Sequence, residues 1–339
     1  MTERQRQRFR QLLRIVLFSA VGGGLFGLLL GDNWTSVARG VGIGLAISAV
    51  LASIETWGGR TALGSRLRRR PFAVVVVARA AGMLLVILAV VQVGFSLFPG
   101  DTTTTLGADF WWAVGFSIAF TLAISFTMQI SELLGQGELG RFVMGRYYRP
   151  RREERILLFC DLVGSTALAE RLGDRAFLDL LNQLYADMAD PILDRQGEVH
   201  KYVGDEIIIS WTVERGLPDA RCLRCADEIR RRLTTLADAY RHRFGTEPRF
   251  RYGLHLGPVV VGELGSLKRE IAMVGDTINT VARLVDVCRS ANRTMVVSQP
   301  LLDRLALPPG LRVEPLGPLV LRGRSQPLAT LAVEPADAL

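Results

Sequence analysis

Apolar residues are concentrated before residue 130, where four long runs stand out. They cover about residues 15–30, 41–54, 72–98 and 110–130. A segment of about 20 consecutive apolar residues is long enough to cross a lipid bilayer as a helix. The last two runs reach that length, whereas the first two are shorter and rich in glycine, which favours close packing between helices. The pattern predicts an N-terminal α-helical membrane domain of four transmembrane helices over residues 1–130.

Basic residues are distributed unevenly around these runs. Arginines crowd the N-terminus and the loop 60–70, whereas the connections 31–39 and 99–109 are poor in basic residues. Cytoplasmic loops of membrane proteins carry an excess of Lys and Arg. We therefore expect a multi-pass protein in a lipid bilayer, in keeping with a bacterial inner membrane, with both termini in the cytoplasm.

The composition changes after the last apolar run. Residues 131–153 carry mixed charges and end in a basic stretch with Pro150, which predicts a juxtamembrane coupling linker. Residues 154–335 have the composition of a soluble, cytoplasmic domain. The formal net charge is +8, but much of the basic excess lies beside the apolar runs. Because neither zinc-finger spacing nor alternation of aromatic and basic residues is present, we expect no nucleic-acid partner.

The soluble part begins with a strand that ends in a candidate metal ligand. The apolar run RILLFCDL predicts a buried strand, which Asp161 closes. Gly164, Ser165 and Thr166 then begin a helix that we expect to continue to about residue 184. A carboxylate in this position can bind Mg²⁺, and the free N–H groups at the helix start can hold phosphate oxygens. On its own, the same pattern also fits an ordinary turn.

A second acidic residue lies at the turn of a predicted hairpin. The sequence GEVHKYVGDEIIISW predicts two strands around a tight turn at residues 203–204, with Asp205 at the turn. Two carboxylates at adjacent strand ends can share two metal ions, as two-metal phosphoryl chemistry requires. Glu206 would point to the opposite face of an extended chain from Asp205, so we expect it outside the metal site.

The next segment predicts two further strands, at residues 250–255 and 259–263, joined at Gly257 and Pro258. His255 lies between two leucines in the first of them. A histidine in that setting is more often structural than catalytic, and we expect the structural role.

An amide and a guanidinium share one face of the last predicted helix. The sequence GDTINTVAR begins a helix at its GDT turn and places Asn279 and Arg283 four residues apart. Such a pair suits a ribose and a phosphoryl group whose negative charge grows in a transition state. From spacing alone, an exposed helix face is the alternative. Closer to the C-terminus, Arg322 and Arg324 flank a glycine in a basic turn that suits polyphosphate, or a solvated hairpin.

Taken in order, these segments resemble the catalytic domain of class III adenylate/guanylate cyclases. The matching sequences are FCDLVGST, HKYVGDE, YGLHLGPVVVGELG, GDTINTVAR and LRGR, and the resemblance covers about residues 154–333. It implies an α/β sandwich of ferredoxin-like type that is active as a head-to-tail homodimer, with composite active sites at the interface. It also implies a membrane-bound adenylate cyclase that converts ATP to 3′,5′-cyclic AMP and pyrophosphate.

The resemblance assigns the metal site and the base. It implies that Asp161 and Asp205 bind two Mg²⁺ or Mn²⁺ ions per active site, assisted by the carbonyl of Leu162. One ion would activate the ribose 3′-hydroxyl and the other would neutralise the triphosphate. Lys201 resembles the family's purine-reading lysine. The second purine-reading position holds Ala272 instead of the usual Asp or Thr, so selectivity for adenine would depend largely on Lys201.

The resemblance also assigns the remaining substrate contacts. Asn279 resembles the ribose-positioning amide and Arg283 the transition-state arginine, while Arg322 or Arg324 stands where the family often has a triphosphate-binding lysine. From the helix start that they form, and not from the resemblance, we expect Gly164, Ser165 and Thr166 to contact substrate phosphates. Two alternatives remain open: a guanylate cyclase, or a catalytically weak nucleotide-binding signalling module of the same fold.

Overall fold

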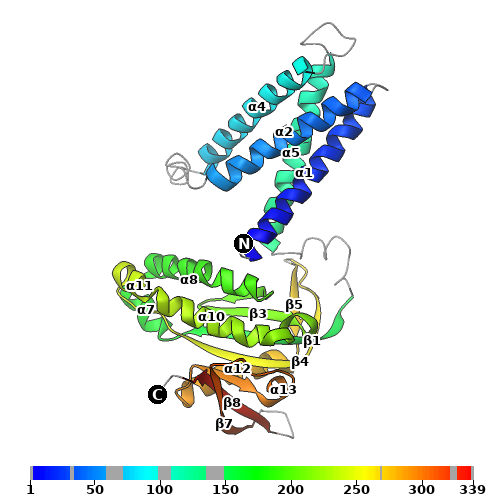
Figure 1. The fold of residues 1–339 in the computed structure, drawn as a ribbon. Coiled ribbons are helices and arrows are strands. Elements are labelled where there is room, and N and C mark those ends of the chain that lie inside the picture. The colour runs from blue at the N-terminus through cyan, green and yellow to red at the C-terminus, as the bar shows by residue number, and fades with distance from the viewer. Residues whose placement is uncertain are drawn as a thin grey trace. The chain divides into compact units, whose positions relative to one another are not determined.

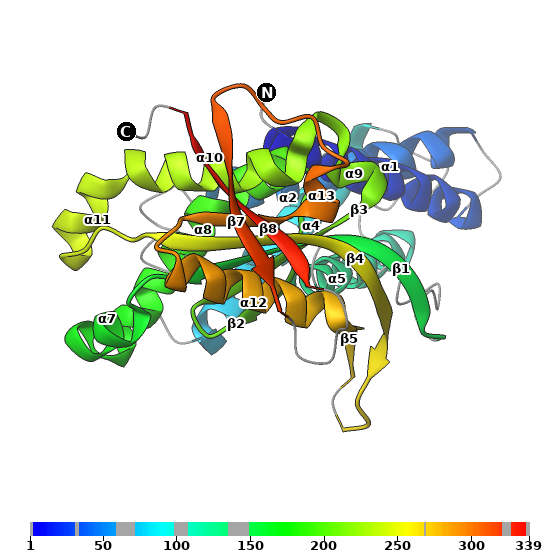
Figure 2. The ribbon, with the colours of Figure 1, turned by 90° about the horizontal axis from the view of Figure 1, so that it is seen from below.

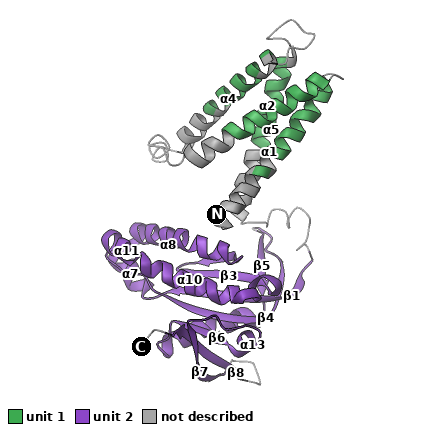
Figure 3. Cartoon of the chain, viewed as in Figure 1, with its two compact units in different colours: residues 1, 5–133 green, residues 2–4, 134–339 purple. Residues whose placement is uncertain are grey.

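The chain forms two compact units (Figure 3). The first comprises residues 1 and 5–133, and the second comprises residues 2–4 and 134–339. The computed structural model describes residues 3–30, 34–58, 72–97, 108–134, 149–267, 269–320 and 327–336.

The first unit is helical, with one helix over each apolar run of the sequence. Its described helices are α1 (Glu3–Leu30), α2 (Trp34–Gly58), α4 (Phe72–Leu97) and α5 (Ala108–Leu134) (Figure 1). Glycines bring the backbones of α1 and α2 close together. A side chain at Gly23 would collide with the carbonyl group of Gly40, and one at Gly27 would collide with that of Ser36. The predicted close packing of these helices is therefore confirmed.

The prediction of four membrane spans is not supported. Spanning a bilayer needs about 20 consecutive apolar residues. In the part of the chain that the structure describes, no helix combines the required length with the required apolar content. Most of the predicted linker 131–153 lies outside the described residues. The inner-membrane location stays a prediction.

The second unit is built on a mixed β-sheet. Its strands are β1 (Arg151–Leu162), β2 (Glu198–Val203), β3 (Glu206–Thr212), β4 (Phe250–Leu264), β5 (Glu270–Val274), β6 (Met295–Ser298), β7 (Leu311–Leu319) and β8 (Leu328–Pro335). Their order is β2-β3-β1-β4-β6-β8-β7, and β5 pairs with β4. Strands β4 and β6 are parallel, and the other pairs within this path are antiparallel. The β2-β3-β1-β4 core has the ferredoxin-like order, which confirms the predicted fold class of this unit.

Helices cover both faces of the sheet (Figures 1 and 2). They are α7 (Ser165–Leu172), α8 (Asp174–Asp194), α9 (Val213–Gly216), the short 3₁₀ helix η1 (Pro218–Ala220), α10 (Arg221–Thr235), α11 (Ala237–Phe244), α12 (Asp276–Ser290) and α13 (Gln299–Leu302). Successive residues of a strand point to opposite faces. Accordingly, Leu158 of β1 packs in the core under α8 and α10, whereas Leu157 and Phe159 pack under α12.

The predicted helix from residue 164 to about residue 184 is interrupted. At Gly173 the backbone adopts φ 75° and ψ 157°, and this residue ends α7 and precedes α8. A positive φ of this kind is easily adopted by glycine and is incompatible with a continuous helix. The apolar pattern continues across the break, which is why it predicts a single helix.

The two strands predicted on either side of Gly257 and Pro258 are one strand, β4. Pro258 lies between the part of β4 that pairs with β6, residues 252–254, and the part that pairs with β5, residues 260–264. Its missing N–H group therefore interrupts neither of those two ladders, and proline is tolerated in a strand at such a position.

Candidate active site

The site is centred on Asp161, near the end of β1. Asp161 lies directly opposite Glu206 of β3 and Arg251 of β4. Directly opposed residues on antiparallel strands project to the same face of a sheet. This face is the one that α12 covers, because Phe159, two residues before Asp161, packs under α12. Asp205 occupies the turn between β2 and β3, after Gly204 with φ 62°.

The prediction that Glu206 is not a metal ligand is not contradicted, but the reasoning behind it does not hold. It assumed an extended chain through Asp205, but this residue is in a turn. The strand begins at Glu206, and the cross-strand register sets the direction of its side chain. Glu206 therefore shares a face with Asp161. Register between distant segments is not visible in a local sequence pattern.

The carboxylates perturb one another. Burial raises the pKa of Asp161, and the negative charge of Asp205 raises it further, while Arg289 and Arg251 oppose the increase. Burial, followed by the charges of Asp161 and Asp205, raises the pKa of Glu206 to about 7. Like charges crowded into a partly dry site disfavour ionisation. This end of the sheet would consequently be stabilised by a cation.

Two arginines approach Asp161 from different elements. The Nη1 atom of Arg251 lies 3.7 Å from Asp161 Oδ2, and the Nη2 atom of Arg289, near the end of α12, lies 3.6 Å from the same oxygen. The side chain of Arg251 is 21% exposed and that of Arg289 is 62% exposed. Neither arginine is predicted from the sequence. Arg251 lies in β4, one residue before the matching segment YGLHLGPVVVGELG begins. No local pattern distinguishes Arg289 from a solvated arginine.

The donor set fits Mg²⁺ or Mn²⁺. Asp161, Asp205 and the Leu162 carbonyl offer hard oxygen donors, the kind that these ions prefer. Among the described residues, no group of three or more His, Cys, Asp or Glu side chains is arranged to hold a metal ion. Mg²⁺ typically binds through one or two carboxylates together with substrate phosphates. Asp161 and Asp205 supply two carboxylates, a number that fits this mode of binding.

The start of α7 lies next to the carboxylates. Gly164 precedes the helix with φ 71°, and no hydrogen bond from a described side chain caps the helix start. The backbone N–H of Val163 donates to the Arg249 carbonyl at 2.8 Å, which anchors the loop to the chain just before β4. The N–H groups of the first turn, including those of Ser165 and Thr166, are thus placed for anionic oxygens.

Lys201 lies on β2, where its Nζ donates to Glu270 Oε1 of β5 at 3.0 Å. Both side chains are partly exposed, at 50% and 40%. Ala272 is two residues after Glu270 and therefore lies on the same face of β5. The structure thus brings the predicted purine-reading lysine beside the strand that carries Ala272.

Asn279 and Arg283 are exposed on α12. The Nη1 atom of Arg283 lies 3.3 Å from Asp286 Oδ2. Asn279 precedes Arg289 by ten residues, which corresponds to about 15 Å along a helix axis. Since Arg289 is the part of α12 that meets Asp161, the structure does not bring Asn279 to the carboxylates of the same chain.

Gly253 positions α12 on the sheet. A Cβ atom at this position of β4 would lie 2.9 Å from the Val281 carbonyl oxygen and 3.2 Å from the Val285 nitrogen. At the start of the helix, the Thr277 hydroxyl donates to the Pro258 carbonyl at 2.7 Å. Close backbone contact and this hydrogen bond fix the part of the helix that carries Asn279 and Arg283.

Comparison with known proteins identifies the domain. Residues 147–333 match the family model for the adenylate and guanylate cyclase catalytic domain, which is more than half of the chain. The chain belongs to this cyclase family. The resemblance of the sequence motifs is therefore confirmed. Arg322 and Arg324, the remaining predicted substrate contacts of the cyclase domain, lie outside the described residues.

Relatives of the cyclase domain include proteins named as adenylate cyclases and proteins named as guanylyl cyclases. Adenylate cyclase 2 of Rhizobium meliloti (strain 1021) is 41% identical over 218 residues, covering 64% of this chain and 60% of the relative. Retinal guanylyl cyclase 1 of Rattus norvegicus is 32% identical over 152 residues, covering 43% of this chain and 13% of the relative. The aligned region thus spans less than two thirds of either relative.

A solved bacterial light-regulated adenylyl cyclase has a similar fold. It superposes with a TM-score of 0.54 at 21% identity, covering 64% of this chain and 64% of that chain. At this identity the likeness concerns the fold alone. It agrees with the mixed sheet of the cyclase domain.

His255 of the cyclase domain is structural, as predicted. It is 4% exposed, and its Nδ1 atom lies 2.7 Å from the Ser298 hydroxyl oxygen. The two residues join β4 to the end of β6. A histidine held in this way between strands stabilises the sheet rather than meeting substrate.

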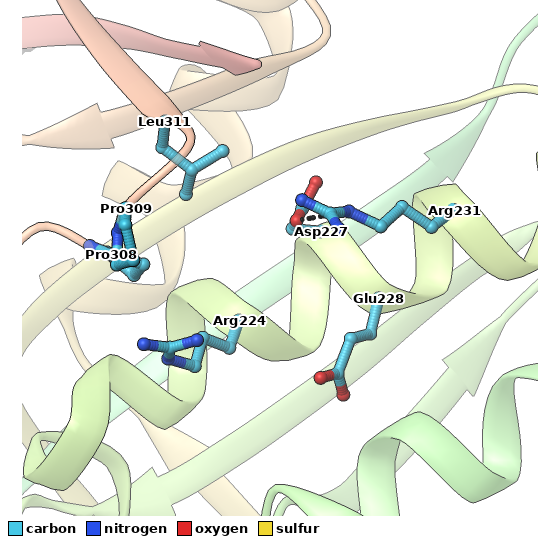
Figure 4. Close-up of a pocket in the computed structure, with 7 residues that line it drawn as sticks. All are labelled: Arg224, Asp227, Glu228, Arg231, Pro308, Pro309 and Leu311. Carbon is cyan, nitrogen blue, oxygen red and sulfur yellow. Dashed lines mark ion pairs between the residues drawn. The ribbon is translucent and has the colours of Figure 1, made fainter. Parts of the chain in front are cut away.

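A separate pocket of about 140 Å³ lies between α10 and the segment before β7 (Figure 4). Its acidic groups already have partners. Asp227 pairs with Arg231 at 2.8 Å, and Glu228 pairs with Arg195. Since α10 covers the opposite face of the sheet from α12, this pocket is separate from the Asp161 site.

Proposed function

We propose that the chain is an adenylate cyclase that converts ATP to 3′,5′-cyclic AMP and pyrophosphate. The observation that carries the proposal is the crowding of Asp161, Asp205 and Glu206 beside the start of α7, in a member of the cyclase family. A partly buried cluster of like charges has an unfavourable electrostatic energy unless it binds a cation. The similarity to a protein named adenylate cyclase 2 favours ATP as the substrate.

Different residues would bind the metal ions and the phosphates of the substrate. Asp161, Asp205 and the Leu162 carbonyl would hold two Mg²⁺ or Mn²⁺ ions per site. When bound, these ions supply activation of the ribose 3′-hydroxyl and neutralisation of the triphosphate. The N–H groups of Ser165 and Thr166 would bind phosphate oxygens at the start of α7.

Asn279 and Arg283 would act on a nucleotide held by a second copy of the chain. Along the axis of α12, Asn279 lies about 15 Å from Arg289, the residue that meets Asp161 of the same chain. Each protomer alone would therefore be incomplete. Both side chains are exposed, and that of Arg283 is 65% exposed. In a head-to-tail homodimer, one protomer would supply the metal carboxylates, and its partner would supply Lys201, Asn279 and Arg283.

Exposed apolar side chains on the β4–β5 hairpin support the proposal of such a dimer. Leu264 is 56% exposed, Val274 57%, and Leu267, in the loop between the strands, 105%. Exposed apolar side chains gathered on one projecting element are typical of protein–protein contacts. Because Lys201 contacts Glu270 on the same hairpin, a partner bound there would also meet the base-reading region.

Guanylate cyclase activity is the second candidate. Ala272 cannot donate or accept a side-chain hydrogen bond, so the base would be read mainly by Lys201 and by backbone groups. The similarity to retinal guanylyl cyclase 1 is consistent with some use of GTP. A lysine donates hydrogen bonds only, which suits N1 of adenine, an acceptor, better than N1–H of guanine, a donor.

The test is product formation by the purified full-length chain with ATP or GTP and Mn²⁺ or Mg²⁺. We expect cyclic AMP, and we expect it to disappear in Asp161→Asn, a change of similar size that removes one negative charge. Cyclic GMP as the main product would transfer the proposal to guanylate cyclase. If a folded dimer forms no cyclic nucleotide from either substrate, the enzymatic proposal is wrong and a nucleotide-binding signalling module replaces it.

A further inference from the structure

Arg289 and Arg251 both pair with Asp161, but they differ in how firmly the structure holds their side chains. Both approach the same carboxylate oxygen, at 3.6 Å and 3.7 Å. Arg251 is on a central strand directly opposite Asp161, and its side chain is 21% exposed. Arg289 is near the end of α12, and its side chain is 62% exposed. Arg251 is therefore held by the sheet, whereas Arg289 is free to change rotamer at little cost.

From its position, the Arg289 guanidinium can reach a second partner besides Asp161, a polyphosphate at the start of α7. It lies in the last turn of α12, where a cation is favoured by the helix dipole. The start of α7, whose N–H groups no described side chain caps, follows Asp161 by only a few residues. A long guanidinium side chain that leaves Asp161 would remain beside any polyphosphate bound there, and guanidinium binds phosphate in a bidentate manner.

We propose that Arg289 is a mobile counterion of the metal site, which pairs with Asp161 before the cation binds and with the nucleotide's polyphosphate afterwards. This inference rests on the proposed function of the Asp161 site. A divalent cation and a guanidinium on Asp161 Oδ2 compete, because both neutralise the same charge. Arg289 therefore weakens binding of the bare ion and strengthens binding of the ion together with the nucleotide. The arrangement would favour the metal–nucleotide complex over metal alone.

The test compares Mn²⁺ binding with and without nucleotide, by titration calorimetry on the purified full-length chain. For Arg289→Gln we expect Mn²⁺ alone to bind about threefold more tightly, the size of effect typical of a partly exposed ion pair. With a non-hydrolysable ATP analogue present, we expect the nucleotide to bind about tenfold more weakly, because one charge-assisted contact is lost. Arg289→Lys, which keeps the charge, should restore most of the first effect and less of the second.

Arg249→Gln is the matched control. Arg249 lies two residues before Arg251, is 75% exposed and pairs with Glu247 at 3.7 Å. The substitution removes the same charge close to the site without removing a partner of Asp161. Both affinities should stay within about a factor of two of wild type, as for other exposed charges. Asp161→Asn should abolish the Mn²⁺ signal and so assign it to this site.

Several results of these titrations would contradict the inference. It fails if Arg289→Gln binds Mn²⁺ no more tightly than Arg249→Gln, or if nucleotide affinity is unchanged. Mn²⁺ binding that appears only in Arg289→Gln would support it, and absence of binding in both wild type and Arg289→Gln would contradict it. These measurements need no turnover. A chain that binds Mn²⁺ as expected but forms no cyclic nucleotide would disprove the proposed function and leave the role of Arg289 standing.

Discussion

Glu206 provides a quantitative test of the electrostatics of the site. Burial and the charges of Asp161 and Asp205 raise its pKa from the ordinary 4.5 to about 7. A carboxyl group with a higher pKa in the folded state binds more protons folded than unfolded. The free energy of unfolding therefore falls as the pH rises from about 4.5 to about 7. We predict that Glu206→Gln removes most of this fall.

The magnitude follows from the same shift. Each tenfold change in proton affinity is worth about 1.4 kcal/mol, so the rise from 4.5 to about 7 corresponds to about 3 kcal/mol. Solvent reaches part of the side chain and reduces this to about 2 kcal/mol. Asp161 has a raised pKa as well, so a smaller slope of the same sign should remain in Glu206→Gln.

The assay is urea unfolding of the full-length chain in EDTA at pH 5 and pH 8. Trp211 is fully buried in the second unit, and the other tryptophans, all before residue 113, would be replaced by phenylalanine so that fluorescence reports on that unit. Glu170→Gln is the control, since Glu170 is an exposed residue of α7. Saturating Mn²⁺ should flatten the pH dependence of wild type, because a bound cation favours the ionised carboxylates.

The reasoning would be refuted if wild type and Glu206→Gln lost the same stability between pH 5 and pH 8. It would also be refuted if wild type were less stable at pH 5 than at pH 8 by a margin that Glu206→Gln abolished. That result would mean that Glu206 is stabilised as the ion, as carboxylates in favourable ion pairs are.

Three further substitutions test other parts of the account. Arg283→Ala should reduce cyclic AMP formation at least 100-fold, as loss of a transition-state contact does. Because its side chain is 65% exposed, the same change should alter the free energy of unfolding by less than about 0.5 kcal/mol; unfolding of the variant would contradict this. Gly253→Ala places a Cβ atom 2.9 Å from the Val281 carbonyl oxygen, so urea unfolding should show a loss of about 2 kcal/mol or more, and a neutral effect would disprove the close packing of α12. Lys201→Gln breaks a partly exposed pair with Glu270 and should cost less than about 1 kcal/mol of stability. Its ratio of cyclic AMP to cyclic GMP, measured with equal ATP and GTP, should fall; an unchanged ratio would remove Lys201 from base reading.

Local signals predicted several elements of the second unit well. A strand that ends near Asp161, a hairpin with Asp205 at its turn and a helix that begins at Asp276 all follow from short stretches of sequence, and the structure has each of them. Apolar periodicity, glycine at turns and helix-start residues act over a few positions, so they are visible in one segment. The Asn279–Arg283 spacing likewise needs only a helix.

Features that depend on pairing of distant segments were not predictable. Glu206 and Arg251 meet Asp161 through the registers of β1 with β3 and with β4, and Arg289 reaches it because α12 crosses the same face. The continuity of β4 through Pro258 depends on which neighbouring strands end there. None of these relations leaves a local trace, which is why the sequence predicts the metal carboxylates but not the charges around them.

Complementation between two inactive chains tests the central claim most directly. Asp161→Asn and Arg283→Ala would be co-expressed with different tags, and the purified heterodimer would be assayed with ATP and Mn²⁺. One of its two composite sites keeps every assigned residue, so we predict cyclic AMP formation at about half the rate of the wild-type homodimer, while each variant homodimer is inactive. A heterodimer as inactive as its parents, beside an active wild type, would contradict sites shared between protomers. A wild-type homodimer that forms no cyclic AMP would contradict the assignment as an adenylate cyclase.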